Sequence, residues 1–163
     1  MLYALLVLAL VAVDQVVKYL VRANIPLGES IPFLPHIMDL TYVQNTGAAF
    51  SIFREHTWIL TLVSLVVSIL LILVLVRKWI TRHVLGRVCL AMVLAGAVGN
   101  LIDRALFHFV TDMFQTTFIN FAVFNVADIC VVVGGIAFCL YYLLLFDKLE
   151  GKEHGHDASG AES

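Results

Sequence analysis

The sequence has few charged residues and little proline. Asp, Glu, Lys and Arg make up 13% of its 163 residues, whereas 61% are hydrophobic, against about 45 to 50% apolar residues in typical soluble domains. This composition excludes a soluble globular protein. The formal net charge is −2, and no basic run lies beside aromatic residues outside the hydrophobic segments. The sequence therefore lacks the electrostatic pattern of a nucleic-acid-binding protein.

Cysteine is also scarce. Cys89, Cys130 and Cys139 lie in apolar stretches, with no C-x-x-C pair and no histidine at the spacing of a zinc site, so neither a disulfide framework nor a structural metal is expected. We expect all three to be buried, unreactive thiols. The six histidines are scattered and no H-E-x-x-H motif is present, so we expect no metal and no cofactor.

Long apolar runs account for most of the chain. A bilayer core of about 30 Å requires about 20 apolar residues in a helix. The sequence therefore predicts an all-α membrane protein with four transmembrane helices, at about 2–20, 57–76, 88–106 and 126–146. We interpret residues 1–146 as one membrane domain and residues 147–163 as a disordered cytoplasmic tail.

The basic residues indicate the orientation of these helices. The connection between the second and third runs contains Arg77, Lys78, Arg82 and Arg87, which is typical of a cytoplasmic loop. Both termini are then cytoplasmic. The outer segment 24–56 contains all three prolines and an extended-looking run. This pattern predicts a small extracytoplasmic β-structure on the membrane surface between helices 1 and 2.

Ionisable side chains inside a span cost about 2.5 to 3.5 kcal/mol at a helix centre, so their presence indicates a function or a compensating partner. Asp14 and Lys18 are four residues apart in the first run and share a helix face. They could form a neutralised pair near the end of the span, or they could contact a ligand directly.

The third run carries a second polar group. Asn100, Asp103 and Arg104 share one face, and Gly96 and Gly99 allow another helix or a ligand to approach that face closely. The alternative is a packing seam held by an Asp103–Arg104 ion pair.

Two further aspartates flank the start of the fourth run. On a continuous helix Asp112 would lie opposite Asp103, so we predict a break between them. The passage 107–111 is rich in aromatic and β-branched residues, which favours an irregular or extended conformation. Asn125 precedes Asp128 by three residues, the spacing of a helix capping box.

The two aspartates also suggest a chemistry. Two close carboxylates in a low dielectric share one proton, so one can act as a base on water and the other as an acid toward a carbonyl. Serine or cysteine catalysis lacks suitably spaced partners. The alternative function is a proton- or ion-coupled carrier in which the carboxylates form a relay. A carrier would spread them across the membrane depth and show inverted repeats, whereas here they gather at one side.

Five short motifs resemble, in order, those of the bacterial lipoprotein signal peptidase (signal peptidase II) family, and the resemblance covers residues 1 to about 146. The motifs are Asp14-Gln15-Val16-Val17-Lys18, Asn45-Thr46-Gly47-Ala48-Ala49-Phe50, Gly99-Asn100-Leu101-Ile102-Asp103-Arg104, Val110-Thr111-Asp112 and Phe124-Asn125-Val126-Ala127-Asp128. One departure is Met113, where family members commonly have Phe.

The resemblance implies an aspartyl endopeptidase of the bacterial cytoplasmic membrane. A monomer suffices for this mechanism, so we expect a monomer. It implies cleavage of diacylglyceryl-modified prolipoproteins directly before the lipidated cysteine, within the membrane lipid. The catalytic pair would be Asp112 and Asp128. The residues that would support the site or hold the substrate are Asp14, Lys18, Asn45, Gly47, Asn100, Asp103, Arg104, Asn125 and Ala127.

Overall fold

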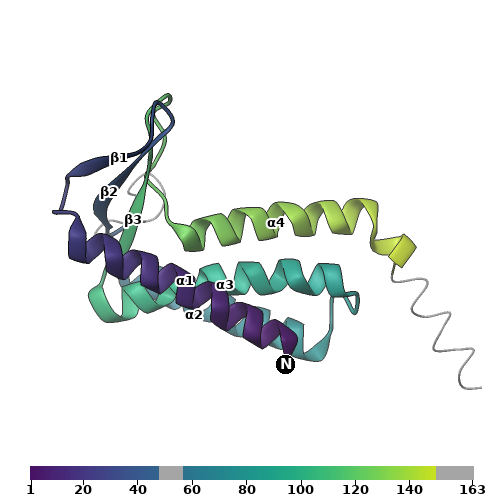
Figure 1. Ribbon diagram of the computed structural model, residues 1–163. Coiled ribbons are helices and arrows are strands. Elements are labelled where there is room, and N and C mark those ends of the chain that lie inside the picture. The colour runs from purple at the N-terminus through teal and green to yellow at the C-terminus, as the bar shows by residue number, and fades with distance from the viewer. Residues whose placement is uncertain (48–56, 150–163) are drawn as a thin grey trace, which may run out of the picture.

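The structure, a computed structural model, describes residues 1–47 and 57–149. Within these residues the chain forms four helices that are long and apolar enough to cross a membrane and a three-stranded sheet (Figure 1). The element order is α1 (Leu2–Asn24), β1 (Ser30–Leu34), β2 (Met38–Asn45), α2 (Thr57–Arg77), α3 (Val84–Phe107), β3 (Val110–Thr116) and α4 (Val126–Leu144). The expected class of four helices with a small β-structure is confirmed.

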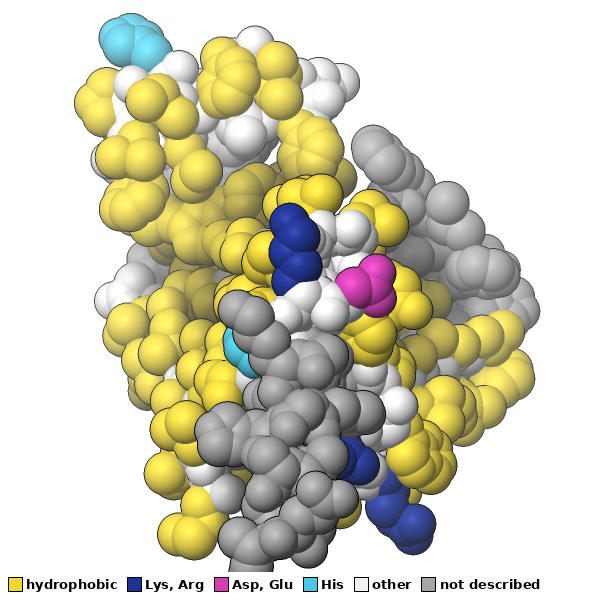
Figure 2. All heavy atoms as spheres, turned by 90° about the vertical axis from the view of Figure 1, so that its right-hand side faces the viewer, with side chains coloured by type: hydrophobic (Ala, Val, Ile, Leu, Met, Phe, Trp, Pro, Cys, Tyr) yellow, Lys and Arg dark blue, Asp and Glu magenta, His cyan; other side chains and the backbone are white. Residues whose placement is uncertain are grey.

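The helix α3 lies at the centre of the bundle. It contacts α1, α2 and α4, and 44% of its membrane-spanning window is buried, against 11% for α2. The outer faces of the other helices carry exposed large hydrophobic side chains, as expected for surfaces in contact with lipid. Figure 2 shows the end of the bundle away from the sheet, where yellow hydrophobic side chains dominate and the few charged ones in view face the viewer.

Two glycines of α3 permit close contacts at the other end of the bundle. A Cβ atom at Gly96 would collide with the backbone oxygen of Ala127 on α4, and one at Gly99 would lie 2.6 Å from Asp14 Oδ2. The predicted close approach along this face is therefore confirmed. It brings the first turn of α4 and an acidic side chain of α1 against the same part of α3.

The sheet is antiparallel, in the order β1-β2-β3. Its third strand comes from the connection between α3 and α4, whereas the sequence led us to expect β-structure only between helices 1 and 2. The predicted break is present: α3 ends at Phe107, and His108 takes a left-handed conformation with φ 63°. The chain then enters β3, which pairs Val110 with Asn45 and Asp112 with Val43.

The base of the sheet is anchored on α1. Val21, Ile25, Tyr42 and Met113 form a buried apolar cluster that joins the end of α1 to β2 and β3. Burial of such side chains stabilises a contact by about 1.5 to 3 kcal/mol each. Because Met113 belongs to this cluster, the residue next to Asp112 is held in place by packing.

Some expected boundaries and environments differ from the structure. The first helix continues to Asn24 rather than residue 20. The third helix, α3, begins at Val84 rather than residue 88, because the His83 Nδ1 caps it by accepting a hydrogen bond from the Leu85 N–H. Cys139 is exposed, because its apolar helix faces lipid, not a protein core. The expected tail lies outside the described residues from residue 150 onward, as do Ala48, Ala49 and Phe50.

The close contact at Gly96 predicts a specific sensitivity to substitution. We expect Gly96→Ala to lower the free energy of unfolding by about 1 to 3 kcal/mol, because the added methyl group overpacks the α3–α4 contact. The matched control is Gly135→Ala on α4, where a Cβ atom meets nothing within 4 Å. Denaturant unfolding in detergent micelles measures both variants, and equal stability of the two would contradict this account of the packing.

Candidate active site

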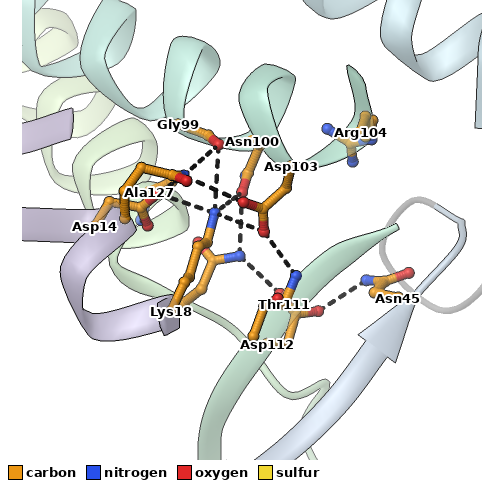
Figure 3. A network of polar contacts seen from close by, with 12 residues as sticks. Asp14, Lys18, Asn45, Gly99, Asn100, Asp103, Arg104, Thr111, Asp112 and Ala127 are labelled. Atoms are coloured by element: carbon orange, nitrogen blue, oxygen red, sulfur yellow. Dashed lines mark hydrogen bonds and ion pairs between the residues drawn. The ribbon is translucent and has the colours of Figure 1, made fainter. Parts of the chain in front are cut away.

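The polar residues predicted from the sequence converge where the bundle meets the sheet (Figure 3). They come from α1, the end of β2, α3, β3 and the first turn of α4. They are Asp14, Lys18, Asn45, Gly47, Asn100, Asp103, Arg104, Asp112, Asn125, Ala127 and Asp128, and the hydrogen bonds, ion pairs and pocket described below join them into one site.

Lys18 stands at the centre of the charged part of the site. Its ammonium group is 2.9 Å from Asp14 Oδ2 and 3.4 Å from Asp103 Oδ2, and it donates to Asn100 Oδ1 at 2.9 Å. Lys18 and Asp103 are 0% exposed and Asp14 is 1% exposed. The predicted Asp14–Lys18 pair is present. Asp103, however, pairs with Lys18, so the alternative of a seam held by an Asp103–Arg104 pair is replaced by a connection between α1 and α3.

The same two aspartates also hold neighbouring segments through backbone amides. Asp14 Oδ1 accepts from the Ala127 N–H at 2.9 Å, and Asp103 Oδ2 accepts from the Thr111 N–H at 2.9 Å. Hydrogen bonds that involve a charged group are the stronger ones. The two carboxylates therefore bind the start of α4 and the start of β3 to the bundle.

Asp112 is held by neutral amides. Asn45 Nδ2 donates to Asp112 Oδ2 at 2.9 Å, and Asn125 Nδ2 donates to Asp112 Oδ1 at 2.7 Å. The Asn45 side chain is itself oriented, because its Oδ1 accepts from the Gly47 N–H at 3.0 Å. Burial raises the pKa of Asp112 to about 6; the amide hydrogen bonds counteract this rise, and the negative charge of Asp128 adds to it.

Asp128 has two roles in the geometry. The capping box predicted from the sequence is present: Asn125 Oδ1 accepts from the Asp128 N–H at 2.9 Å, and Asp128 Oδ2 accepts from the Asn125 N–H at 3.1 Å. The remaining oxygen, Oδ1, accepts from Asn100 Nδ2 at 2.8 Å. The cap therefore orients the Asp128 carboxylate, and Asn125 contacts Asp112 and Asp128 at once.

A pocket of about 500 Å³ contains both aspartates. Its polar wall includes Asn45, Asn100 and Arg104, and the Arg104 Nε, which is buried, has no hydrogen-bond partner among the described residues. The rest of the lining is apolar and consists of Val110, Phe121, Ala122, Val123, Phe124, Ile129, Val132 and Val133. Because Val132 and Val133 are exposed on α4, the pocket reaches the lipid-facing surface of the bundle.

Three polar residues of this region are absent from the predicted set. Gln15 Nε2 donates to Asp14, to the Gly99 carbonyl and to Asp103, at 3.1 to 3.2 Å. Arg22 and Thr111 hydrogen-bond to each other at 2.9 Å. Arg22 follows Lys18 by four residues, the same spacing that placed Asp14 and Lys18 on one helix face. The sequence could therefore have indicated that Arg22 lies on that face too. Thr111 has no comparable signal, because only the sheet brings it to the bundle.

The fold and the pocket define a class: an integral membrane protein that holds two carboxylates at one end of a four-helix bundle. Residues 6–145 match the family model of signal peptidase (SPase) II. The chain belongs to the signal peptidase II family, and is therefore a multi-pass membrane protein of a peptidase family. This membership favours the peptidase hypothesis over the carrier.

Relatives of similar length support this membership. The chain is 41% identical to the lipoprotein signal peptidase of Enterococcus faecalis, covering 93% of this chain and 92% of the relative. The corresponding protein of Streptococcus pneumoniae is 42% identical, with coverage of 91% and 95%. Two solved structures described as bacterial membrane enzymes are similar, with TM-scores of 0.80 and 0.79 and identities of 29% and 28%, covering 90% and 88% of this chain and 89% and 93% of theirs.

The buried ion pairs predict the effect of removing their shared cation. We expect Lys18→Met to lower the free energy of unfolding by about 3 to 5 kcal/mol, because Asp14 loses its compensating charge in a buried setting and Asp103 keeps only the more distant Arg22. Lys78→Met, at an exposed lysine after α2, is the matched control and should change stability little. Denaturant unfolding in micelles compares the two, and similar values would show that Lys18 does not compensate these carboxylates.

Proposed function

We propose that the protein is an aspartyl endopeptidase that removes the signal peptide of diacylglyceryl-modified prolipoproteins by cleaving before the lipidated cysteine. The observation that carries the proposal is the pair Asp112 and Asp128 in one pocket, both contacted by Asn125. The names of the relatives support the substrate class. Serine, cysteine or metal chemistry has no comparable group of residues among those that line the pocket.

The proposed reaction uses one proton shared by the two carboxyl groups. Because burial raises the pKa of Asp112 to about 6, we assign the proton to Asp112 and the base to Asp128. Asp128 takes a proton from water as the oxygen attacks the scissile carbonyl carbon, and Asp112 protonates the carbonyl oxygen. The tetrahedral intermediate then breaks its C–N bond, the nitrogen receives the proton from Asp128, and a hydroxyl of the intermediate returns a proton to Asp112.

The surroundings of the pair suit a peptide substrate. Arg104, Asn45 and Asn100 line the pocket, and each asparagine amide has a second N–H besides the one that donates to an aspartate. We therefore assign these three side chains to hold substrate carbonyl groups. Gly47, two residues beyond the end of β2, also lines the pocket. The remaining predicted residues, Asp14, Lys18, Asp103 and Ala127, support the site through the network between the helices.

We also propose an orientation in the bacterial cytoplasmic membrane. The N-terminus and the end of α4 lie at the same end of the bundle, away from the sheet (Figure 1). That end also carries the basic connection after α2, so the positive-inside rule assigns it to the cytoplasm. The sheet and the pocket then face outward, where the substrate is exposed. One chain supplies both carboxylates, so we propose a monomer as the active unit.

The first test measures cleavage of a diacylglyceryl-modified prolipoprotein by the purified protein in detergent. We expect Asp112→Asn and Asp128→Asn to lower kcat at least about 100-fold, because each loses one proton-transfer group. Asp103→Asn should keep residual activity, and Asp147→Asn, an exposed aspartate beyond α4, should match the wild type. The proposal fails if the folded wild type leaves the substrate intact, or if both active-site variants still cleave it.

The pH dependence tests the assignment of the acid. The hydrogen bond from Asn45 lowers the pKa of Asp112, so Asn45→Leu should raise that pKa further. Asp112 then keeps its proton to higher pH, and the alkaline limb of the kcat/KM profile moves to higher pH. Gln44→Leu, next in sequence, removes an amide that donates to the Tyr42 hydroxyl and is the control. A shift to lower pH, or the same shift in both variants, would count against Asp112 as the acid.

A further inference from the structure

Arg22 lies near the end of α1 and joins three elements. Its Nη1 donates to Thr111 Oγ1 on β3 at 2.9 Å and is 3.8 Å from Asp103 Oδ1 on α3. Its guanidinium carbon lies 4.6 Å from the centre of the Phe107 ring. The Arg22 side chain is 19% exposed. An arginine that contacts a hydroxyl, a carboxylate and an aromatic face at once is more strongly oriented than a free surface arginine.

The contacts of Arg22 lead directly to the residue before Asp112. Thr111 is bound twice: its side chain accepts from Arg22, and its backbone N–H donates to Asp103 Oδ2 at 2.9 Å. Asp103 is 0% exposed and pairs with Lys18. The start of β3 is therefore tied to α1 through its side chain and to α3 through its backbone. A shift of Thr111 would move Asp112, its covalent neighbour.

We propose that Arg22 is a positioning residue for the peptidase reaction, which holds the start of β3 against α1 and α3 and thereby sets where Asp112 lies relative to Asp128. We call Arg22, Thr111 and Asp103 the Arg22 clamp. The inference rests on the proposed function. Arg22 and Thr111 are not among the described residues that line the pocket, so the clamp acts on the geometry of the carboxylates and not on substrate binding.

A simpler role for Arg22 is to supply positive charge at a helix C-terminus. Arg22 is the basic residue in the last turn of α1, as Arg77 is in the last turn of α2, and such a cation interacts favourably with the helix dipole. A lysine would preserve that charge. It would not reproduce the planar guanidinium, which keeps Nη1 beside Thr111 and Asp103 while its carbon lies over the Phe107 ring. Substitution by lysine therefore separates the clamp from the dipole effect, and Arg77→Lys is the matched control.

The test measures kcat and KM of the full-length protein on a diacylglyceryl-modified prolipoprotein. We expect Arg22→Lys to lower kcat about tenfold, because a small misplacement of a catalytic group is costly, with KM within about twofold of the wild-type value because substrate contacts are retained. Thr111→Val should lower kcat similarly, and the double variant should lose little more than either single one. Thr111→Ser keeps the hydroxyl and should restore activity, and Arg77→Lys should match the wild type.

A second measurement does not depend on activity. Hydrogen–deuterium exchange over residues 108–114 should be faster in Arg22→Lys and Thr111→Val than in the wild type and Arg77→Lys, because the Thr111 N–H is less protected. Faster exchange combined with an inactive wild type would support the clamp and overturn the proposed function. The clamp is overturned if the wild type cleaves the substrate and Arg22→Lys has the same kcat as the wild type. A change in Arg22→Lys that is confined to KM would overturn it as well.

Discussion

The burial of the Lys18 ammonium group between Asp14 and Asp103 is the constraint on which the rest of the site depends. A charge removed from water inside a membrane protein requires opposite charge and further hydrogen bonds. These partners come from α1 and α3, and the same carboxylates also accept from the backbones of Ala127 and Thr111. The contacts that compensate the buried charge of Lys18 thus set the relative positions of two helices, the first turn of α4 and the start of β3.

In this site the ion pairs are made by other aspartates than the proposed acid, Asp112. Asp14 and Asp103 contact cations, whereas Asp112 is held by the neutral amides of Asn45 and Asn125. A direct ion pair would stabilise the carboxylate and lower its pKa. Amide donors orient the group with a weaker effect of this kind, so burial dominates and the pKa of Asp112 rises to about 6. Asn125 also donates to Asn100 Oδ1, which accepts from Lys18. This asparagine therefore links Asp112 to the charged network without adding charge to the site.

Local spacing made part of the site predictable. The Asp14–Lys18 pair and the Asn125–Asp128 cap depend on residues three or four apart, so the sequence alone indicates them. The cap and a role in the site are compatible, because the two oxygens of Asp128 have different partners. Contacts between Asn45 and Asp112, or between Thr111 and Asp103, depend on the strand register and on the bulge between Leu40 and Val43. No sequence spacing encodes that register, which also explains why the third strand was not expected.

The position of Asp128 on α4 also relates the proposed chemistry to a lipidated substrate. Asp128 lies in the first turn, and Ile129, Val132 and Val133 continue the pocket wall along the helix. Residues four apart share a helix face and are separated by about 6 Å along the axis. The wall therefore changes from polar to apolar within about one helical turn. A peptide whose lipid-bearing residue adjoins the scissile bond matches this order: its carbonyl would meet the carboxylates while its acyl chains run along α4 into the surrounding lipid.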